Sequence, residues 1–297
     1  MQLAVHTDIN DEDQTIYFPE IKTTAKDADT NSNISCAKKE ITLVDTVSFK
    51  GLVPNQKYEV TGTLMDKETK KPVELDGKPV TAKASFKPKE SAGTVEVTFT
   101  FDASSLKGKT VVVFESLAYK DKEVAVHADI ADEGQTIYFP EIKTTATDAA
   151  SGTHYAKPEK ELTLTDLVEY KNLIPGKEYK LAGTLMDAET KKPFEVDGKA
   201  VTAETSFTPE EPSGSVELSF TFDASALSGK TLIAFETLSY EEHEVAVHAD
   251  IKDANQTIYF PEIKTTAKDG SDGDQDVSAS KEATIVDTVT YLSLIHI

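Results

Sequence analysis

The chain has 297 residues and a formal net charge of −21, because 52 acidic residues stand against 31 basic ones. This charge excludes the basic face with which proteins meet nucleic-acid phosphates. The hydrophobic content of 38% is ordinary and argues against disorder, and the single cysteine, Cys36, excludes an intramolecular disulfide.

The sequence repeats itself at an offset of 121 residues, since QTIYFPEIKTTA begins at Gln14, Gln135 and Gln256. This period is too long for a solenoid unit and suits one independent domain. No apolar run is long enough to span a membrane. The first residues show neither the basic nor the apolar region of a signal peptide.

The repeats predict five segments along the chain. From LSLIHI at Leu292 the third copy departs from the pattern, and this string resembles the translation of a sequencing-adapter end, so we interpret it as foreign sequence. The expected segments are residues 1–19, the last strand of a truncated repeat; 20–140 and 141–261, two full repeats; 262–291, the start of a truncated third repeat; and 292–297, the foreign tail.

Within a repeat the chain is predicted to form strand after strand. An alternating run over residues 58–64 follows a turn signal at Pro54-Asn55, and a second run over residues 95–101 follows a turn signal at Asp76-Gly77. The stretch FDASSLKGK suggests a single helical turn. Short strands without a long helical pattern predict an all-β fold of tandem immunoglobulin-like antiparallel β-sandwich domains, with about seven or eight strands each.

Two carboxylates in each repeat lie in phase with apolar strand residues. Asp45 shares its face with the apolar positions of EITLVDTVSF, and Glu115 with those of VVVFESL; Asp166 and Glu236 repeat the pattern. A buried carboxylate is costly unless it is paired or protonated, and two in contact can share one proton. For one such acid alone a hydrogen-bonded structural role is the simpler interpretation, but the recurrence of both favours a shared site.

A threonine and a glutamine stand at the two ends of each repeat. Period-two alternation points Thr23 inward and Thr24 outward. Thr23 opens the first strand and Gln135 is expected on the last strand, 112 residues later; Thr144 and Gln256 have the same separation. First and last strands of such a sandwich can lie side by side. Taken singly, each of these residues is also an ordinary strand residue.

A histidine precedes each glutamine by eight residues. A threonine hydroxyl is a poor nucleophile without a base, and His127 is a plausible one. Asp132 is the candidate to orient it, with Asp129 as the alternative, and repeat two has His248 and Asp253 at the matching positions. A solvated strand end is the alternative interpretation of a lone histidine among charged residues.

Together the motifs HADIADEGQT, TTA, LVDTV and VVFE resemble the Thr–Gln ester-bond domain found in VaFE-repeat surface proteins and adhesin stalks of Gram-positive bacteria. The resemblance covers nearly the whole chain. It implies an autocatalytic ester between the first-strand threonine and the last-strand glutamine, with release of ammonia. The implied roles are nucleophiles Thr23 and Thr144, acyl donors Gln135 and Gln256, bases His127 and His248 held by Asp132 and Asp253, and the amide-polarising acid pairs Asp45 with Glu115 and Asp166 with Glu236.

Incomplete sites are expected at both ends of the chain. His6 and Gln14 belong to a repeat whose first strand is missing, and Thr265 and Asp287 to a repeat whose glutamine is missing. Thr265 could in principle meet Gln14, but two stiffly linked domains between them would hold the ends apart. We therefore expect two esters rather than three, and frayed ends.

The resemblance implies a stalk segment of a cell-surface adhesin, extracellular and anchored to the cell wall. Its cross-links would form once, without external substrate or turnover, so the chain is not expected to be an enzyme. Neighbouring repeats and a host or matrix ligand are the expected partners; no cofactor, metal, nucleic acid or membrane contact is expected. The alternatives are an immunoglobulin-like spacer or ligand-binding adhesin module without a cross-link, and a carbohydrate- or Ca²⁺-binding module, against which the lack of Trp and of a DxDxDG-type loop argues.

Overall fold

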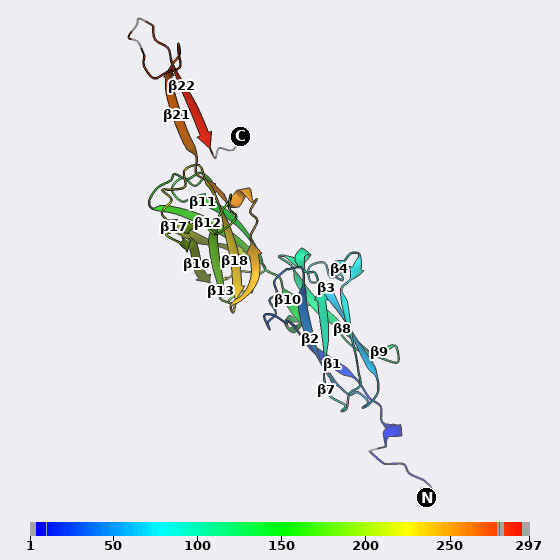
Figure 1. The fold of residues 1–297 in the computed structure, drawn as a ribbon. Helices are drawn as coiled ribbons and strands as arrows, with labels where there is room; N and C mark the ends of the chain where they lie inside the picture. The colour runs from blue at the N-terminus through cyan, green and yellow to red at the C-terminus, as the bar shows by residue number, and fades with distance from the viewer. Residues whose placement is uncertain (1–3, 10, 278, 280–281, 293–297) are drawn as a thin grey trace. The chain divides into compact units, whose positions relative to one another are not determined.

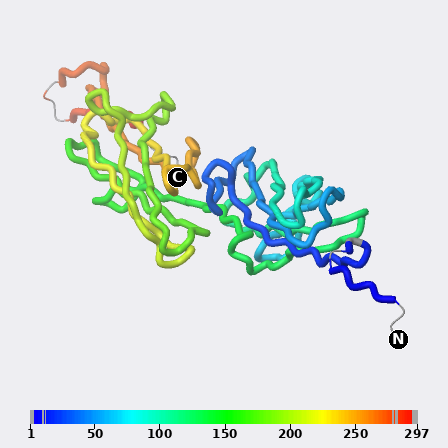
Figure 2. Tube along the Cα trace, turned by 90° about the horizontal axis from the view of Figure 1, so that it is seen from below, coloured from blue at the N-terminus to red at the C-terminus, as the bar shows by residue number. Residues whose placement is uncertain are grey.

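The computed structural model describes residues 4–9, 11–277, 279 and 282–292. The chain divides into two compact units, residues 1–140 and 141–297, and each is described by itself (Figure 1). The chain passes from one unit to the other at Pro140 and Glu141, within the green part of the trace (Figure 2).

Unit one is a sandwich of two antiparallel sheets. The three-stranded sheet has the order β1-β2-β7. In the five-stranded sheet β3 lies between β6 and β8, and the other edge of β8 pairs with both β9 and β10. A small hairpin of β4 and β5 lies outside these two sheets. The elements are η1 (Glu12–Gln14), β1 (Glu20–Asp27), β2 (Ile41–Lys50), β3 (Tyr58–Asp66), β4 (Glu74–Leu75), β5 (Lys78–Pro79), β6 (Thr81–Phe86), β7 (Gly93–Phe101), η2 (Ser104–Leu106), β8 (Thr110–Tyr119), β9 (Lys122–His127), η3 (Glu133–Gln135) and β10 (Thr136–Tyr138).

Unit two repeats this sandwich and adds a terminal hairpin. Its three-stranded sheet has the order β11-β12-β17, and its five-stranded sheet joins β13, β16, β18, β19 and β20. The elements are β11 (Glu141–Asp148), β12 (Leu162–Lys171), β13 (Tyr179–Asp187), β14 (Glu195–Val196), β15 (Lys199–Ala200), β16 (Thr202–Phe207), β17 (Gly214–Phe222), β18 (Thr231–Tyr240), β19 (His243–His248), η4 (Ala254–Gln256), β20 (Thr257–Tyr259), β21 (Glu262–Asp269) and β22 (Ile285–Leu292).

The alternation read from the sequence corresponds to the two faces of each sheet. In β2 every second side chain from Ile41 to Phe49 is buried, and the core lies between the two sheets. The predicted turn at Asp76-Gly77 joins β4 to β5 with φ values of 52° and 72°, which favour Gly at the second position. The predicted helical turn is η2. The all-β, immunoglobulin-like fold class is therefore confirmed.

The first and last strands of a repeat, which were expected to lie side by side, belong to different sheets. β1 belongs to the three-stranded sheet and β10 to the five-stranded sheet, so the two strands contact each other across the sandwich without pairing. Gln135 is not on the last strand but ends the η3 turn directly before β10. The reason is local: the Asp132 side chain accepts a hydrogen bond from Gly134 N at 2.7 Å and starts a helical turn there.

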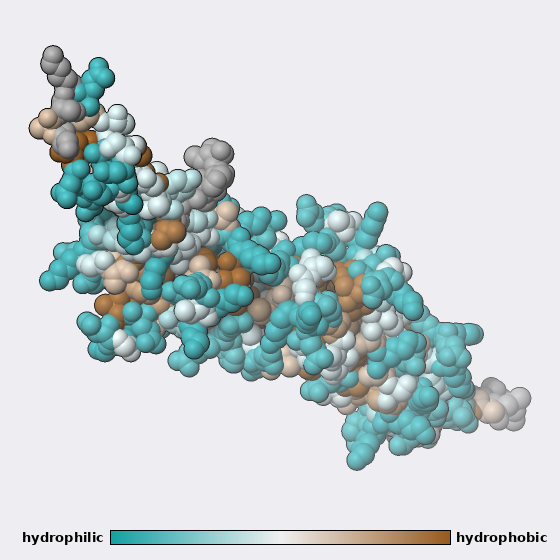
Figure 3. Space-filling model, turned by 45° about the horizontal axis from the view of Figure 1, so that its top comes forward, coloured by the Kyte–Doolittle hydropathy of each residue, from teal (hydrophilic) through white to brown (hydrophobic). Residues whose placement is uncertain are grey.

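The two terminal segments differ from one another. Among residues 4–9 and 11–19 there is no strand, only η1, although a last strand was expected there. At the other end β21 and β22 form a hairpin with exposed hydrophobic side chains, including Ile263, Ile285 and Val289. Leu292, the first residue of the expected foreign tail, still belongs to β22, and residues 293–297 lie outside the described residues. Elsewhere hydrophilic side chains dominate the visible face (Figure 3).

Gly62 lies in β3 directly opposite Glu115 of β8, with its missing side chain on the core face. A Cβ at Gly62 would lie 2.5 Å from Cζ of the buried Phe99 ring. We expect Gly62→Ala to destabilise unit one by about 1–3 kcal/mol, because the new methyl group would overlap the buried Phe99 ring. Urea unfolding followed by peptide-resolved hydrogen exchange, with unit two as internal reference, measures this.

The matched control for this substitution is Thr61→Ala, one residue earlier on the partly exposed outer face of β3. It should change stability by no more than about 0.5 kcal/mol. Equal losses of stability in the two variants would show that a methyl group at position 62 can be accommodated beside the Phe99 ring.

Candidate functional site

The threonine pair of β1 separates as strand geometry requires. Thr23 is 7% exposed and faces the core, whereas Thr24 is exposed. Thr23 lies opposite Val47 in β2, and Asp45 lies opposite Ala25, two positions along the same inward face. β1 and β2 therefore bring a hydroxyl and a carboxyl to the same part of the core.

The five-stranded sheet supplies the groups that meet them. Glu115 of β8 accepts a hydrogen bond from Thr23 Oγ1 through Oε2 at 2.9 Å. The amide nitrogen of Gln135 contacts Thr23 Oγ1 and lies 3.2 Å from Asp45 Oδ1. All four side chains are buried, with exposures of 0–7%. The site is thus a polar cluster between the two sheets, closed to solvent.

Asp45 and Glu115 form the pair of buried carboxyls that the sequence suggested. Burial, and then the charge of Asp45, raise the pKa of Glu115 to about 10. Burial also raises the pKa of Asp45, although hydrogen bonds from Glu115 and Gln135 work in the opposite direction. Asp45 Oδ2 and Glu115 Oε1 receive no hydrogen bond from other described residues, and one proton between the carboxyls satisfies both. Glu115 is therefore neutral at neutral pH.

His127 lies beside the pair and is held by Asp132. It ends β9 directly opposite Glu115 in the β8–β9 ladder. His127 Nε2 donates to Asp132 Oδ2 at 2.7 Å, and the other Asp132 oxygen caps η3. The hydrogen bond of the Thr23 hydroxyl goes to Glu115, and His127 is hydrogen-bonded to Asp132 instead. The side chain of Asp129, the alternative orienting residue, accepts only from the backbone N–H of Ala131 in the described contacts.

Unit two reproduces the arrangement. Thr144 Oγ1 donates to Glu236 Oε2 at 3.1 Å, and the amide nitrogen of Gln256 contacts Thr144 Oγ1. The same nitrogen lies 3.3 Å from Asp166 Oδ1. Burial and the neighbouring carboxyl raise the pKa of Glu236 to about 10. His248 Nε2 lies 2.8 Å from Asp253 Oδ2.

The sequence matches the family described as "T-Q ester bond containing domain" three times, over residues 19–139, 140–260 and 261–296. The chain belongs to this family. The family resemblance read from the motifs is thereby confirmed. No curated protein sequence matches the chain.

Several solved structures are similar to this chain. Two crystal forms of a bacterial adhesin from Mobiluncus mulieris, described as containing intramolecular disulfide, isopeptide and ester bond cross-links, are each 15% identical to it. They align with 92% and 93% of this chain and 97% and 93% of their own, with TM-scores of 0.35 and 0.36. A β-glucuronidase 2 of Bacteroides uniformis is 11% identical over 75% of this chain and 27% of its own, with a TM-score of 0.30. The family match remains the observation that identifies the chain.

The incomplete TQ half-sites are not assembled. In unit one His6 pairs with Asp11 and Gln14 is exposed. In unit two Thr265 and Asp287 keep the hairpin register of the complete repeats, with Ala267 opposite Asp287, but both are exposed. The first segment thus has no strand among residues 4–9 and 11–19, and the last one has both strands of a hairpin with exposed apolar side chains. The fraying of the two ends stays a prediction.

One structural residue of the site was missed in the sequence. Thr136 follows Gln135, is fully buried, and donates its hydroxyl to Asp132 O at 2.7 Å. This bond closes η3 around the glutamine, and Thr257 does the same for Gln256 in unit two. The signal was present, because a threonine follows the glutamine in all three copies of QTIYFPE.

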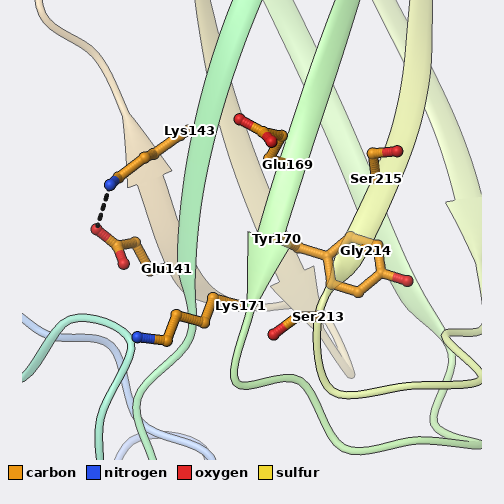
Figure 4. Close-up of a pocket in the computed structure, with 8 residues that line it drawn as sticks. All are labelled: Glu141, Lys143, Glu169, Tyr170, Lys171, Ser213, Gly214 and Ser215. Atoms are coloured by element: carbon orange, nitrogen blue, oxygen red, sulfur yellow. Dashed lines mark ion pairs between the residues drawn. The ribbon is translucent and has the colours of Figure 1, made fainter.

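The open pocket in unit two is separate from the cross-link residues. It lies on the outer face of the three-stranded sheet, where Lys143 reaches Glu141 at 3.9 Å (Figure 4). Lys143 neighbours Thr144, but adjacent strand residues face opposite sides. Its lining residues are Glu141, Lys143, Glu169, Tyr170, Lys171, Ser213, Gly214 and Ser215. Among the described residues there is no cluster that could hold a metal, and no helix long and apolar enough to cross a membrane.

The raised pKa of the buried glutamates predicts a pH-dependent stability. Burial and the neighbouring carboxyl raise the pKa of Glu115 and Glu236 from 4.5 to about 10 in the folded chain, and a Thr23→Ala, Thr144→Ala chain, which cannot form the esters, loses only a hydrogen bond that lowers this pKa. The folded state then binds more protons than the unfolded state between these pH values, so its stability falls as pH rises. We expect a loss of about 1.4 kcal/mol per pH unit for each group, measured by urea unfolding across this range.

The control carries Glu115→Gln and Glu236→Gln in the same background. Glutamine keeps the shape and a donor but cannot ionise, so this chain should lose most of the slope. If the free energy of unfolding fell equally with pH in both chains, groups other than Glu115 and Glu236 would be responsible for the pH dependence.

Proposed function

We propose that each full repeat forms an intramolecular ester between its threonine and its glutamine. Thr23 Oγ1 attacks the side-chain carbonyl carbon of Gln135, the C–N bond breaks, and ammonia leaves with the hydroxyl proton. The observation that carries the proposal is the contact between Thr23 Oγ1 and the Gln135 amide nitrogen, because the ester puts that oxygen in the nitrogen's place. Thr144 and Gln256 react in the same way.

The carboxyl pair offers a path for the proton. The Thr23 hydroxyl already donates to Glu115, Glu115 is neutral, and Asp45 lies beside the amide nitrogen that must leave as ammonia. Glu115 accepts the hydroxyl proton as its own passes to Asp45, and the Asp45 carboxyl protonates the nitrogen. The pair holds one proton before and after, so the step balances. This relay replaces His127 as the first acceptor and leaves the His127–Asp132 pair to hold the η3 turn.

The burial of the site explains why such a bond would persist. An ester exposed to water hydrolyses, and a dry site slows this reaction. The reacting side chains are between 0% and 7% exposed, and Gly62, which lies opposite Glu115, leaves room for the buried Phe99 ring. The chemistry occurs once per repeat and uses no external substrate, so the chain is not a turnover enzyme.

At the level of the whole molecule we propose a stalk segment of an extracellular cell-surface adhesin, anchored to the cell wall. Tandem repeats of one domain, a strongly acidic composition and the family match support this role. A tie between the two ends of each repeat would carry pulling force past the rest of the domain. The neighbouring repeats are the proposed partners, together with a host or matrix ligand outside this segment.

An intact mass tests the ester directly. The folded chain should be lighter than its sequence by two ammonia molecules, one for each full repeat. Thr23→Ala should restore one of them, because it removes the nucleophile of repeat one. Thr24→Ala, the matched control on the exposed face, should leave both losses in place. A mass equal to the sequence would refute the cross-link and leave the plain spacer.

The relay predicts that Glu115 matters more than His127. Glu115→Gln removes the proton acceptor and should slow ester formation in repeat one by about 100-fold or more, the size of a general acid–base contribution. His127→Ala should slow it less, since its effect passes through the η3 turn. The measurement is the cross-linked fraction of each repeat over time after dilution from denaturant, with repeat two as internal reference. Equal slowing would return the base role to His127.

A further inference from the structure

The two full repeats share every cross-link residue but differ at several positions nearby, including two within the turn before the glutamine, where Glu133-Gly134 of repeat one correspond to Ala254-Asn255 of repeat two. One further difference lies on another strand. Lys67 stands directly after β3 in repeat one, and Ala188 takes its place in repeat two. Their backbone N–H groups make matching hydrogen bonds, to Thr110 O at 3.0 Å and to Thr231 O at 3.1 Å. The local backbone contact is therefore the same at both positions, and Lys67 and Ala188 differ there in the side chain.

The lysine side chain reaches the segment that carries the glutamine. β8 lies between β3 and β10, so a long side chain at the end of β3 can cross β8 to β10. Lys67 Nζ donates to Thr136 Oγ1 at 3.3 Å. Ala188 has no atom that could reach the corresponding Thr257.

Thr136 is the hydroxyl that closes the η3 turn. Its Oγ1 donates to Asp132 O at 2.7 Å, and Gln135 and Asp132 both depend on the position of this turn. Thr136 is 0% exposed, whereas Thr257 is 7% exposed. The threonine that accepts from Lys67 is thus the less exposed of the two.

We propose that Lys67 is a positioning residue that clamps η3 and keeps water from the ester of repeat one, and that repeat two lacks this clamp. The inference rests on the proposed function, because it concerns the lifetime of the same ester. Hydrolysis adds one water across the bond, which restores the threonine hydroxyl and leaves a carboxyl where the glutamine amide stood. The ester of repeat one therefore hydrolyses more slowly than that of repeat two.

The experiment has two steps. The intact mass first establishes that both esters are present in the full chain; if neither is, the proposed function fails and the clamp with it. The folded chain is then held at about pH 9, where lysine is still mostly protonated. Peptide mapping follows the gain of one water in each repeat. We expect repeat two to hydrolyse about fivefold faster, a factor corresponding to one ordinary hydrogen bond.

Reciprocal substitutions assign the difference to the lysine. Lys67→Ala should bring repeat one to the rate of repeat two, and Ala188→Lys should slow repeat two. Lys67→Met keeps the length but loses the donor and should behave like Lys67→Ala, whereas Lys67→Arg should retain slow hydrolysis. Circular dichroism shows that each variant is folded. Equal rates in the unmodified chain, or rates that ignore both substitutions, would overturn the clamp while the ester itself stands.

Discussion

A pair of carboxyls buried between two sheets is the constraint on which the rest of each repeat depends. Asp45 comes from the three-stranded sheet and Glu115 from the five-stranded sheet, so neither is satisfied until the sandwich closes. Two negative charges in contact inside a core would be severely destabilising, and the single proton that Glu115 retains removes this penalty. The neutral acid then becomes a donor to Asp45 and an acceptor for Thr23.

The location of the threonine and glutamine gives the proposed bond its mechanical meaning. Thr23 belongs to one sheet and Gln135 adjoins the other, so an ester would join the two layers as well as the two ends of the repeat. The loop it closes spans 112 residues, for which the chain-entropy picture gives about 4–5 kcal/mol by analogy with disulfides. A chain with a single cysteine has no disulfide within itself to do this.

The sequence allowed the burial of the site to be predicted but not its full topology. Period-two alternation is a local property, and it placed Thr23, Asp45 and Glu115 on inward faces. Which sheet a strand joins is not a local property. The sequences of β1 and β10 do not indicate that β1 pairs with β2 and β10 with β8, in different sheets. The η3 turn was also missed, because a short apolar run after Gln135 indicates a strand, while the helical turn depends on the Asp132 cap and the Thr136 hydroxyl.

The three copies of QTIYFPE show that the neighbouring strands, and not the local sequence alone, determine whether this segment forms a strand. Thr136 to Tyr138 form β10 because Val112 and its neighbours in β8 lie opposite them, whereas the identical residues 15–17 form no strand. The position of the glutamine therefore depends on β8, which also carries Glu115. The nucleophile, by contrast, lies on a hairpin that forms from local sequence, as β21 and β22 do in the third copy. The site therefore depends on both sheets at once, because the five-stranded sheet supplies Glu115 and positions Gln135, while the three-stranded sheet supplies Thr23 and Asp45.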